Sequence, residues 1–238
     1  MSEATELREL YQQLLQRLER NEREFRRLGR AVWKVQEDER RRIARELHDG
    51  VGQNLTVLKH RLHELDAALA PRDDALRGTV AAALALCGDT LEDTRELSRM
   101  LRPPILDDLG LEAALRWLVR SQGQSSGAQV TLEIDALPPL DGELQTLLFR
   151  VTQEALTNAA KHAGAGEIQV VLHRRGASLL LEIFDNGRGC DPELALASGG
   201  NGLGGMRERL RLYGGQLQLR SAVGEGMRVS ARVPLDYT

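Results

Sequence analysis

Apolar residues recur at steps of three and four along most of the first hundred residues, the spacing of one buried helical stripe. Glycine and proline are nearly absent before Gly50, so the pattern predicts one long helix, or two nearly continuous ones, over residues 5–69. Pro71 disfavours helix at the residue before it, and a second helix is predicted over about 74–101. The stripe begins with Leu7, Tyr11, Leu14, Leu18, Asn21, Phe25, Leu28, Val32 and Val35.

The first part of this stripe has the heptad spacing of a coiled coil. Asn21 lies on the seam, and a lone asparagine there often fixes the register and a two-stranded state at some cost in stability. We therefore predict a parallel homodimer. Two antiparallel helical hairpins, one from each chain, would then form a four-helix bundle, so the first half is expected to be mainly α.

The pattern changes from about residue 129, where alternating strands and short helices replace the long stripe. Strands are predicted over 130–134, 168–173, 179–184, 216–220 and 227–233, and helices over about 111–121, 141–162 and 205–213. Arg175-Gly176-Ala177 reads as the turn of a hairpin. Helices mixed with a largely antiparallel sheet predict an α+β second domain.

The 238 residues suffice for two cores, and the aromatic content of 3% leaves packing to aliphatic side chains. A net charge of −3 gives no argument for direct nucleic acid binding. Cys87 and Cys190 lie far apart in sequence, which favours a reducing compartment over a disulfide framework or a zinc site. No apolar run approaches a membrane span and no signal peptide is evident, so we expect a cytoplasmic chain, either separate or the cytoplasmic part of a membrane-anchored sensor.

His48 is the candidate nucleophile of the first half. It lies one helical step from the apolar stripe of Ile43, Leu47 and Val51, and therefore on the flank of the predicted bundle. A neutral imidazole is a nucleophile, Asp49 could orient it or take its proton, and Gln53 could position a water. Taken alone, a histidine in a charged helix is more often an ordinary surface residue.

Four polar segments of the second half suggest a phosphate and nucleotide site. Glu154 and Asn158 share a helix face and carry oxygen ligands suited to Mg²⁺, with Lys161 and His162 one turn further on. Asp185 follows a strand directly, where it could accept from an adenine amino group. The segment Gly199–Arg207 enters a helix and could cradle phosphate, and Gly224–Val229 leads into the last strand. Each segment alone is a weak signal.

The run ERRRIARELHDGVGQ, residues 39–53, resembles the phosphoacceptor box of sensor histidine kinases of the NarX/DesK class. The resemblance implies that His48 is autophosphorylated, that Asp49 assists the transfer, and that Gln53 is a phosphatase amide. It also implies a NarL-type response regulator as partner. The run LRPPILDDLGL, residues 101–111, resembles the junction between the two domains of this class.

The order and spacing of the second-half segments resemble the N, G1 and G2 boxes of the GHKL ATPases, with a Bergerat-type α/β sandwich that binds Mg-ATP under a lid. By this resemblance Asn158 is the Mg²⁺ ligand with Glu154 as its acidic neighbour, and Asp185 contacts adenine. The remaining nucleotide-binding positions are expected to be Lys161, His162, Gly187, Gly189, Gly202, Leu203 and Gly204. Met227 stands where the family usually carries threonine, which puts one water contact to adenine in doubt, and Cys190 is expected to pack rather than to touch the nucleotide.

These observations predict four segments: a signalling coiled coil over 1–38, a dimerisation and phosphotransfer domain over 39–103, a linker with a short helix over 104–128, and a catalytic ATP-binding domain over 129–238. Two alternatives stay open, a GHKL ATPase without kinase activity and a phosphatase-biased pseudo-kinase. The input signal is not encoded in any recognisable segment, so an upstream sensor domain or a separate sensor protein is expected to supply it.

Overall fold

The computed structural model describes residues 3–69, 74–197 and 202–237, and the chain divides into two compact units. The first unit contains the N-terminal stretch up to Lys34 together with Leu109–Thr238, and the second contains Val35–Asp108. Among the described residues, no helix combines the length and the apolar character that crossing a membrane requires.

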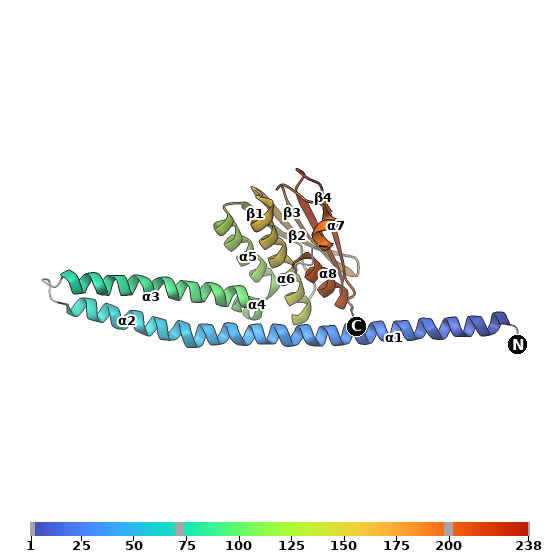
Figure 1. Cartoon of the computed structure of the whole chain (residues 1–238), viewed down its shortest axis with the longest axis horizontal. Coiled ribbons are helices and arrows are strands. Elements are labelled where there is room, and N and C mark those ends of the chain that lie inside the picture. Colours follow the sequence, from blue (N-terminus) through green and yellow to red (C-terminus); the bar gives the residue numbers. More distant parts are fainter. Residues whose placement is uncertain (1–2, 70–73, 198–201, 238) are drawn as a thin grey trace. The chain divides into compact units, whose positions relative to one another are not determined.

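The second unit is a helical hairpin (Figure 1). Helix α1 (Glu3–Glu46) runs into it and passes through a π-helical turn, η1 (Leu47–Gly52), to α2 (Gln53–Ala68). Helix α3 (Asp74–Leu101) packs against α2 and η1, and the short helix α4 (Pro104–Asp108) follows. Residues 70–73, which include Pro71, lie outside the described residues. The predicted long helix is therefore present with a π turn in it, which the stripe of apolar residues did not indicate.

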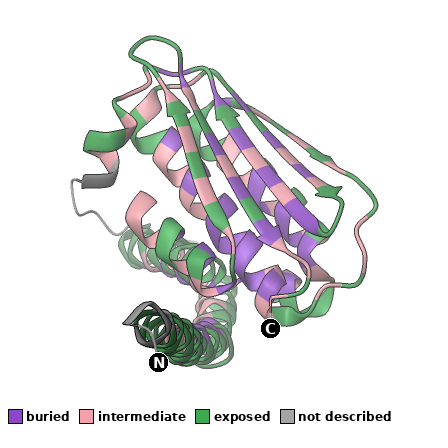
Figure 2. Ribbon diagram, turned by 90° about the vertical axis from the view of Figure 1, so that its right-hand side faces the viewer, coloured by how far each residue is buried: buried purple, intermediate pink, exposed green. Residues whose placement is uncertain are grey.

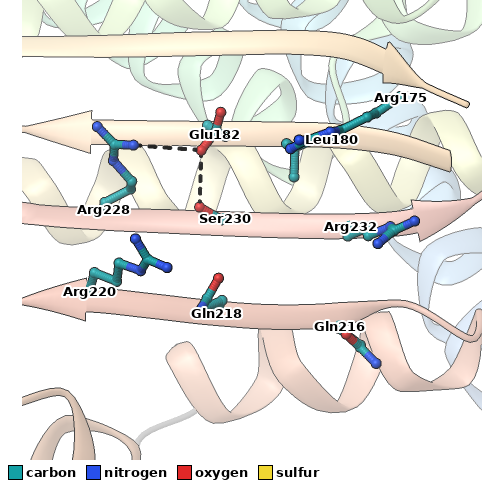
Figure 3. Close-up of a pocket in the computed structure, with 9 residues that line it drawn as sticks. All are labelled: Arg175, Leu180, Glu182, Gln216, Gln218, Arg220, Arg228, Ser230 and Arg232. Atoms are coloured by element: carbon teal, nitrogen blue, oxygen red, sulfur yellow. Dashed lines mark hydrogen bonds and ion pairs between the residues drawn. The ribbon is translucent and has the colours of Figure 1, made fainter.

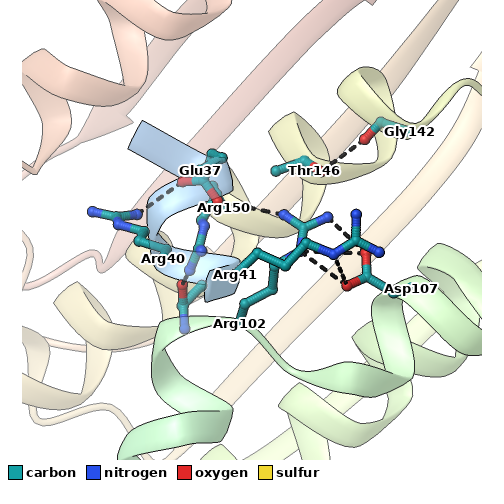
Figure 4. Close-up of polar contacts among 9 residues, drawn as sticks. Glu37, Arg40, Arg41, Arg102, Asp107, Gly142, Thr146 and Arg150 are labelled. Carbon is teal, nitrogen blue, oxygen red and sulfur yellow. Dashed lines mark hydrogen bonds and ion pairs between the residues drawn. The ribbon is translucent and has the colours of Figure 1, made fainter. Parts of the chain in front are cut away.

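Small polar side chains of α3 tie the hairpin together. The Ser98 hydroxyl donates to the carbonyl of Ala44 at 2.8 Å, and the Cys87 thiol donates to the carbonyl of Leu55 at 3.3 Å. At the end of α3, Arg102 forms ion pairs with Glu37 at 3.5 Å and with Asp107 at 2.8 Å (Figure 4). The Arg102 guanidinium thus joins α4 to α1 within this unit.

The first unit contains a five-stranded sheet in the order β1-β2-β3-β5-β4. Its strands are β1 (Gln129–Ile134), β2 (Glu167–Arg175), β3 (Ser178–Asp185), β4 (Gln216–Ser221) and β5 (Met227–Pro234). All neighbours are antiparallel except β1 and β2, which are parallel because helix α6 (Gly142–Asn158) connects them. The predicted α+β fold is confirmed, with this parallel pair as the detail that alternation could not show.

One face of the sheet is covered by helices (Figures 1 and 2). Helix α5 (Gly110–Ser126) contacts β1, α6 contacts β3, and α8 (Leu203–Leu212) contacts β4 and β5. Inward residues such as Val170, Leu181 and Ala231 are completely buried, whereas their strand neighbours are partly or fully exposed. This alternation is the pattern of a sheet with one packed and one open face.

An aromatic cluster closes the core of the first unit behind α8. Tyr213 is completely buried, and its ring meets those of Trp33 and Tyr237 edge-on at centroid distances of 5.5 and 5.0 Å. Its hydroxyl donates to the Glu143 carboxylate at 3.0 Å, and the Arg30 guanidinium lies 5.9 Å from its ring centroid. Burial, reinforced by the charge of Glu143, raises the pKa of Tyr213 far above its usual value, so the hydroxyl stays a donor.

Replacing Tyr213 with Phe should lower the free energy of unfolding by about 1–2 kcal/mol, because the Glu143 carboxylate loses its buried donor while the ring packing is kept. Urea denaturation followed by circular dichroism measures the loss. Tyr11→Phe is the matched control, because the Tyr11 hydroxyl makes no hydrogen bond among the described residues and the change keeps the ring on the predicted seam, so this variant should unfold at the wild-type midpoint. An unchanged midpoint for Tyr213→Phe would mean that the hydroxyl contributes nothing to this core.

Candidate active site

A cavity of about 550 Å³ opens in the first unit between α6, the end of β3 and the start of α8. It lies where the sequence predicted a nucleotide site, and residues from all four polar segments line it. Of the predicted positions, eight line it: Glu154, Asn158, Lys161, His162, Asp185, Gly189, Gly202 and Leu203. Gly187 and Gly204 do not line it, and Gly199, Gly200 and Asn201 of the predicted phosphate segment lie outside the described residues.

Asp185 places a carboxylate at the inner end of the cavity. It is the last residue of β3, it is 6% exposed, and it accepts a hydrogen bond from the backbone N–H of Gly187 at 3.0 Å. Burial raises the pKa of this carboxyl, and backbone N–H donors from Gly187 and Met227 counteract part of the rise. A buried carboxylate with remaining acceptor capacity can take an amino group of a flat ring, as the sequence predicted.

The side-chain amide of Asn158 is a buried polar group that a ligand could bind. Its Nδ2 atom is buried and has no hydrogen-bond partner among the described residues, although Glu154 lies one helical turn away on the same side of α6. A buried, unpaired amide costs free energy unless something binds it. Rotation of the amide about its terminal bond offers either its nitrogen to a phosphate oxygen or its oxygen to a cation.

These residues fit Mg²⁺ only if a substrate supplies further ligands. Among the described residues, no group of three or more His, Cys, Asp or Glu side chains is placed to hold a metal ion. Mg²⁺ is commonly bound through one or two protein ligands plus phosphate oxygens and waters. Asn158 and Glu154 would suffice for that arrangement.

Two glycines make the cavity wall thin. A Cβ atom on Gly202 would lie 2.7 Å from the Glu154 carboxylate and 3.4 Å from the Asn158 amide, so a side chain there would press on both groups. Gly189 has a φ of 62°, and a Cβ on it would overlap the carbonyl oxygen of Ala222. Gly187 is also packed closely, against Ala163, whereas Gly204 has open space around it and needs no glycine for steric reasons.

Lys161 and His162 lie in a second π-helical turn, η2 (Ala159–Ala163), which continues α6. Both side chains are exposed and line the cavity. Single π turns often occur at functional sites, because the wider turn displaces side chains from the ordinary helical positions. This π turn was not predicted. Because it is wider than an α-helical turn, α-helical spacing from Asn158 gives only an approximate direction for the side chains of Lys161 and His162.

The cavity-lining residues that were not predicted as part of the site include Arg188, Cys190 and Met227. Arg188 lies within the Asp-Asn-Gly-Arg-Gly segment, Cys190 was expected to have a packing role, and Met227 was noted only as a departure from a family pattern. The signal for Arg188 was its position between two glycines of the motif. The Met227 backbone hydrogen bond to Asp185 has no sequence signal, since any residue supplies it.

His48 lies in the second unit, inside η1, with an exposed side chain. It borders a hollow of about 370 Å³ together with Gln53 and with Thr94 and Arg95 of α3. Asp49 is exposed but does not border the hollow. The structure thus groups His48 with Gln53, and adds Thr94 and Arg95, which only the pairing of α3 with the π turn could have indicated.

The π turn also corrects one expectation about the stripe. Val51 was expected to be buried with Ile43 and Leu47, but it is 44% exposed in the single chain, and its neighbour Gly52 is buried instead. Hydrogen bonding from residue i to i+5 widens the turn, so the buried position moves by one residue. A Cβ on Gly52 would meet only the Leu47 carbonyl oxygen at 3.5 Å, an ordinary contact.

Comparison with known families matches both halves. The family described as "Histidine kinase" matches residues 39–106, and the family described as "Histidine kinase-, DNA gyrase B-, and HSP90-like ATPase" matches residues 143–237. The two matches do not overlap, and together they span most of the chain. The chain belongs to the histidine kinases. The resemblance to the NarX/DesK class is thereby confirmed, and with it an ATP-binding domain of the GHKL type.

Solved structures of histidine kinases are similar to this kinase. The histidine kinase domain of the Erythrobacter litoralis EL346 blue-light activated histidine kinase is 21% identical, with a TM-score of 0.49, over 77% of this chain and 94% of that one. A second structure of the EL346 protein is 22% identical, with a TM-score of 0.50, over 59% of this chain and 54% of that one. The Acinetobacter baumannii histidine kinase AdeS is 16% identical, with a TM-score of 0.45, over 79% and 98%.

The raised pKa of Asp185 makes its charge costly to the fold. A group whose pKa is raised by folding contributes stability that is present below its unfolded pKa and is lost as pH rises through its folded pKa. At neutral pH, Asp185→Asn should therefore keep or raise the urea midpoint, and it should weaken ATP binding because the carboxylate acceptor is lost. Urea unfolding and isothermal titration calorimetry with ATP measure the two effects.

Asp135→Asn is the control for that experiment, because Asp135 is exposed and does not line the cavity. It should change neither the midpoint nor the affinity. An unperturbed aspartate has a pKa near 4, and burial raises the pKa of Asp185. On acidification, the ATP affinity of the wild type should therefore begin to fall at a higher pH than it would with an unperturbed aspartate. A clear loss of stability in Asp185→Asn with unchanged ATP affinity would contradict the assignment.

Proposed function

We propose that this kinase transfers the γ-phosphoryl group of ATP to a ring nitrogen of His48 and then to an aspartate of a response regulator. The exposed imidazole beside an open hollow is the observation that supports His48, since a nucleophile must be reachable. The other exposed histidines of the second unit, His60 and His63, do not border this hollow.

In the proposed step, the imidazole nitrogen of His48 forms a bond to the γ-phosphorus, and the bond from that phosphorus to the β,γ-bridging oxygen breaks. ADP leaves with the electron pair of the broken bond. The other ring nitrogen carries a proton that must be released or held, and we assign this proton to Asp49, the adjacent exposed carboxylate. Phosphoryl transfer needs positioning and charge neutralisation more than covalent assistance.

The nucleotide is proposed to bind with its adenine amino group on Asp185 and its phosphates near Asn158, Lys161 and His162. Glu154 and Asn158 would hold a Mg²⁺ ion, which when bound neutralises charge on the phosphates. We assign Gly202, Leu203 and Gly204 to the lid side of the pocket. Gly202 lies so close to Glu154 that a side chain at this position would press on the carboxylate. Gly187 and Gly189 shape the adenine side.

Gln53 is proposed to position a water that hydrolyses the phosphorylated regulator. It borders the same hollow as His48, so one docked aspartyl phosphate could face either residue. We further propose that the regulator is of the NarL type. We assign four roles along the chain: a signalling coil over residues 1–38, a phosphotransfer domain over 39–103, a linker over 104–128 and a catalytic domain over 129–238. The kinase is proposed to act as a cytoplasmic dimer. A sensor domain or a separate sensor protein is proposed to supply its input.

Exposure of the coil seam supports the dimer. All eight predicted apolar seam residues of α1 are more than half exposed in the single chain, from Leu14 at 54% to Val32 at 71%. A contiguous exposed apolar stripe on a long helix is typical of a surface that pairs with another helix.

Replacing His48 with Gln should abolish incorporation of phosphate from γ-labelled ATP, because the amide cannot act as the nucleophile. ATP binding, measured by calorimetry, should be unchanged, since His48 lies in a different unit from the nucleotide cavity. His60→Gln is the control, as His60 is an exposed histidine of α2 outside the hollow. Labelling that persists in His48→Gln would refute the assignment.

Replacing Gln53 with Ala should leave autophosphorylation near the wild-type rate and slow dephosphorylation of the regulator by at least about tenfold, because the attacking water loses its positioning amide. The rate is read from decay of the phosphorylated regulator in the presence of the kinase. Asn54→Ala is the control, because this neighbouring exposed amide does not border the hollow. Equal dephosphorylation rates for Gln53→Ala and wild type would remove the phosphatase role.

A further inference from the structure

The open face of the sheet carries a second hollow, unrelated to the nucleotide cavity. It has a volume of about 580 Å³ and lies over β3, β5 and β4, on the side that the helices leave uncovered (Figure 3). We name it the arginine face, and it comprises Leu180, Glu182, Arg220, Arg228, Ser230 and Arg232, with Arg175 and two glutamines at its border. Nothing in the proposed kinase reaction uses it.

Strand pairing arranges this face in three rows. Phe184, Arg228 and Arg220 pair across the strands in one row, Glu182, Ser230 and Gln218 in the next, and Leu180, Arg232 and Gln216 in the third. The outer rows each combine an apolar side chain of β3 with an arginine of β5. They are separated by four residues along each strand, a distance of about 13 Å.

Positive charge on this face exceeds what its one carboxylate can balance. Glu182 accepts from the Ser230 hydroxyl at 3.3 Å and lies 3.9 Å from Arg228. No carboxylate of the described residues forms an ion pair with Arg175 or Arg220, and Arg232 donates only to the Ser178 hydroxyl at 3.3 Å. Four guanidinium groups therefore face one carboxylate.

The pairing of Arg220 with Arg228 is unfavourable for the fold itself. The two residues are direct partners across β4 and β5, and like charges in that position destabilise a sheet. Arg228 also lies over the ring of Phe184, 5.8 Å from its centroid, and this ring is 38% exposed. Partly exposed aromatic and arginine side chains together are typical of the centre of a protein interface.

We propose that the arginine face binds an acidic segment of a partner protein, with carboxylates about 13 Å apart that reach the two outer rows. Guanidinium forks bind carboxylates through paired hydrogen bonds, and an extended strand places residues i and i+4 at this spacing on one side. Phe184 and Leu180 offer each carboxylate-bearing side chain an apolar neighbour.

A continuous polyanion fits this face less well than a short acidic segment. The adjoining half of the sheet carries Glu133 and Glu167 on exposed positions of β1 and β2, and these carboxylates would repel a phosphate backbone that continued across the sheet. A compact anion such as triphosphate is too short to reach both outer rows. An acidic protein segment can end where the positive charge ends.

The test uses the full chain and a fluorescent oligoglutamate peptide, with binding followed by anisotropy at low salt. Arg175→Glu and Arg220→Glu should each weaken peptide binding about tenfold, because each replaces a positive charge that attracts the peptide by a negative one that repels it. Neither change breaks an ion pair among the described residues. Arg120→Glu, the same change on an exposed position of α5, should bind as the wild type does. All three variants should bind ATP normally, which shows that they fold.

Three results would overturn the proposal. Absence of saturable oligoglutamate binding removes the site, and equal weakening by Arg120→Glu shows only general electrostatic attraction. Tighter binding of a single-stranded oligothymidylate of equal charge, lost in the same variants, would make the face a nucleic acid site instead. As a second measurement, Arg220→Gln should keep or raise the urea midpoint, and a lower midpoint would mean that the arginine serves the fold.

Discussion

The buried carboxylate of Asp185 is the constraint on which the nucleotide cavity depends. A carboxylate at the end of β3 must keep its hydrogen-bond donors, and backbone N–H groups of Gly187 and Met227 supply them. Those donors come from the segment after β3 and from the first residue of β5, so both must approach the end of β3 closely. A Cβ on Gly226 would overlap the Asp185 carbonyl oxygen, and one on Gly189 would overlap that of Ala222. Gly189 and Gly226 are therefore required by the close backbone packing around the end of β3, apart from any role in the proposed binding site.

The second constraint on this cavity is the side-chain amide of Asn158, which lines it together with Asp185. The Asn158 side-chain nitrogen is buried and has no hydrogen-bond partner in the described part of the chain, a cost that the fold tolerates where a ligand supplies the missing hydrogen bond. The two groups lie on different elements, α6 and β3, and the sheet core between them fixes their positions. The helical unit differs in that its candidate residue, His48, is exposed rather than buried and borders a hollow beside η1. Buried groups at the cavity and an exposed imidazole on the helical unit are what the proposed phosphoryl transfer requires.

Much of this was predictable from the sequence because it depends on periodicity and on residue types. The long helices, the antiparallel strands and the grouping of Glu154, Asn158 and Asp185 follow from spacing and motif order. The two π turns did not, since hydrogen bonding from i to i+5 leaves no mark in the apolar pattern, and both contain predicted site residues. Helix α7 (Pro192–Ala197) was not among the predicted helices. The arginine face depends on the order of β5 between β3 and β4, which only the folded sheet provides.

The central claim is that one imidazole on the helical unit receives phosphate from ATP bound in the other unit. Mass spectrometry of the wild-type kinase, incubated with Mg-ATP and digested with trypsin under alkaline conditions, tests it most directly. Cleavage after Arg45 and Lys59 releases a peptide whose sole histidine is His48. That peptide should gain one phosphoryl group, and brief acid treatment should remove it. Phosphate on a peptide that carries His162 or His173, or an acid-stable phosphate on any peptide in place of this one, would contradict the account.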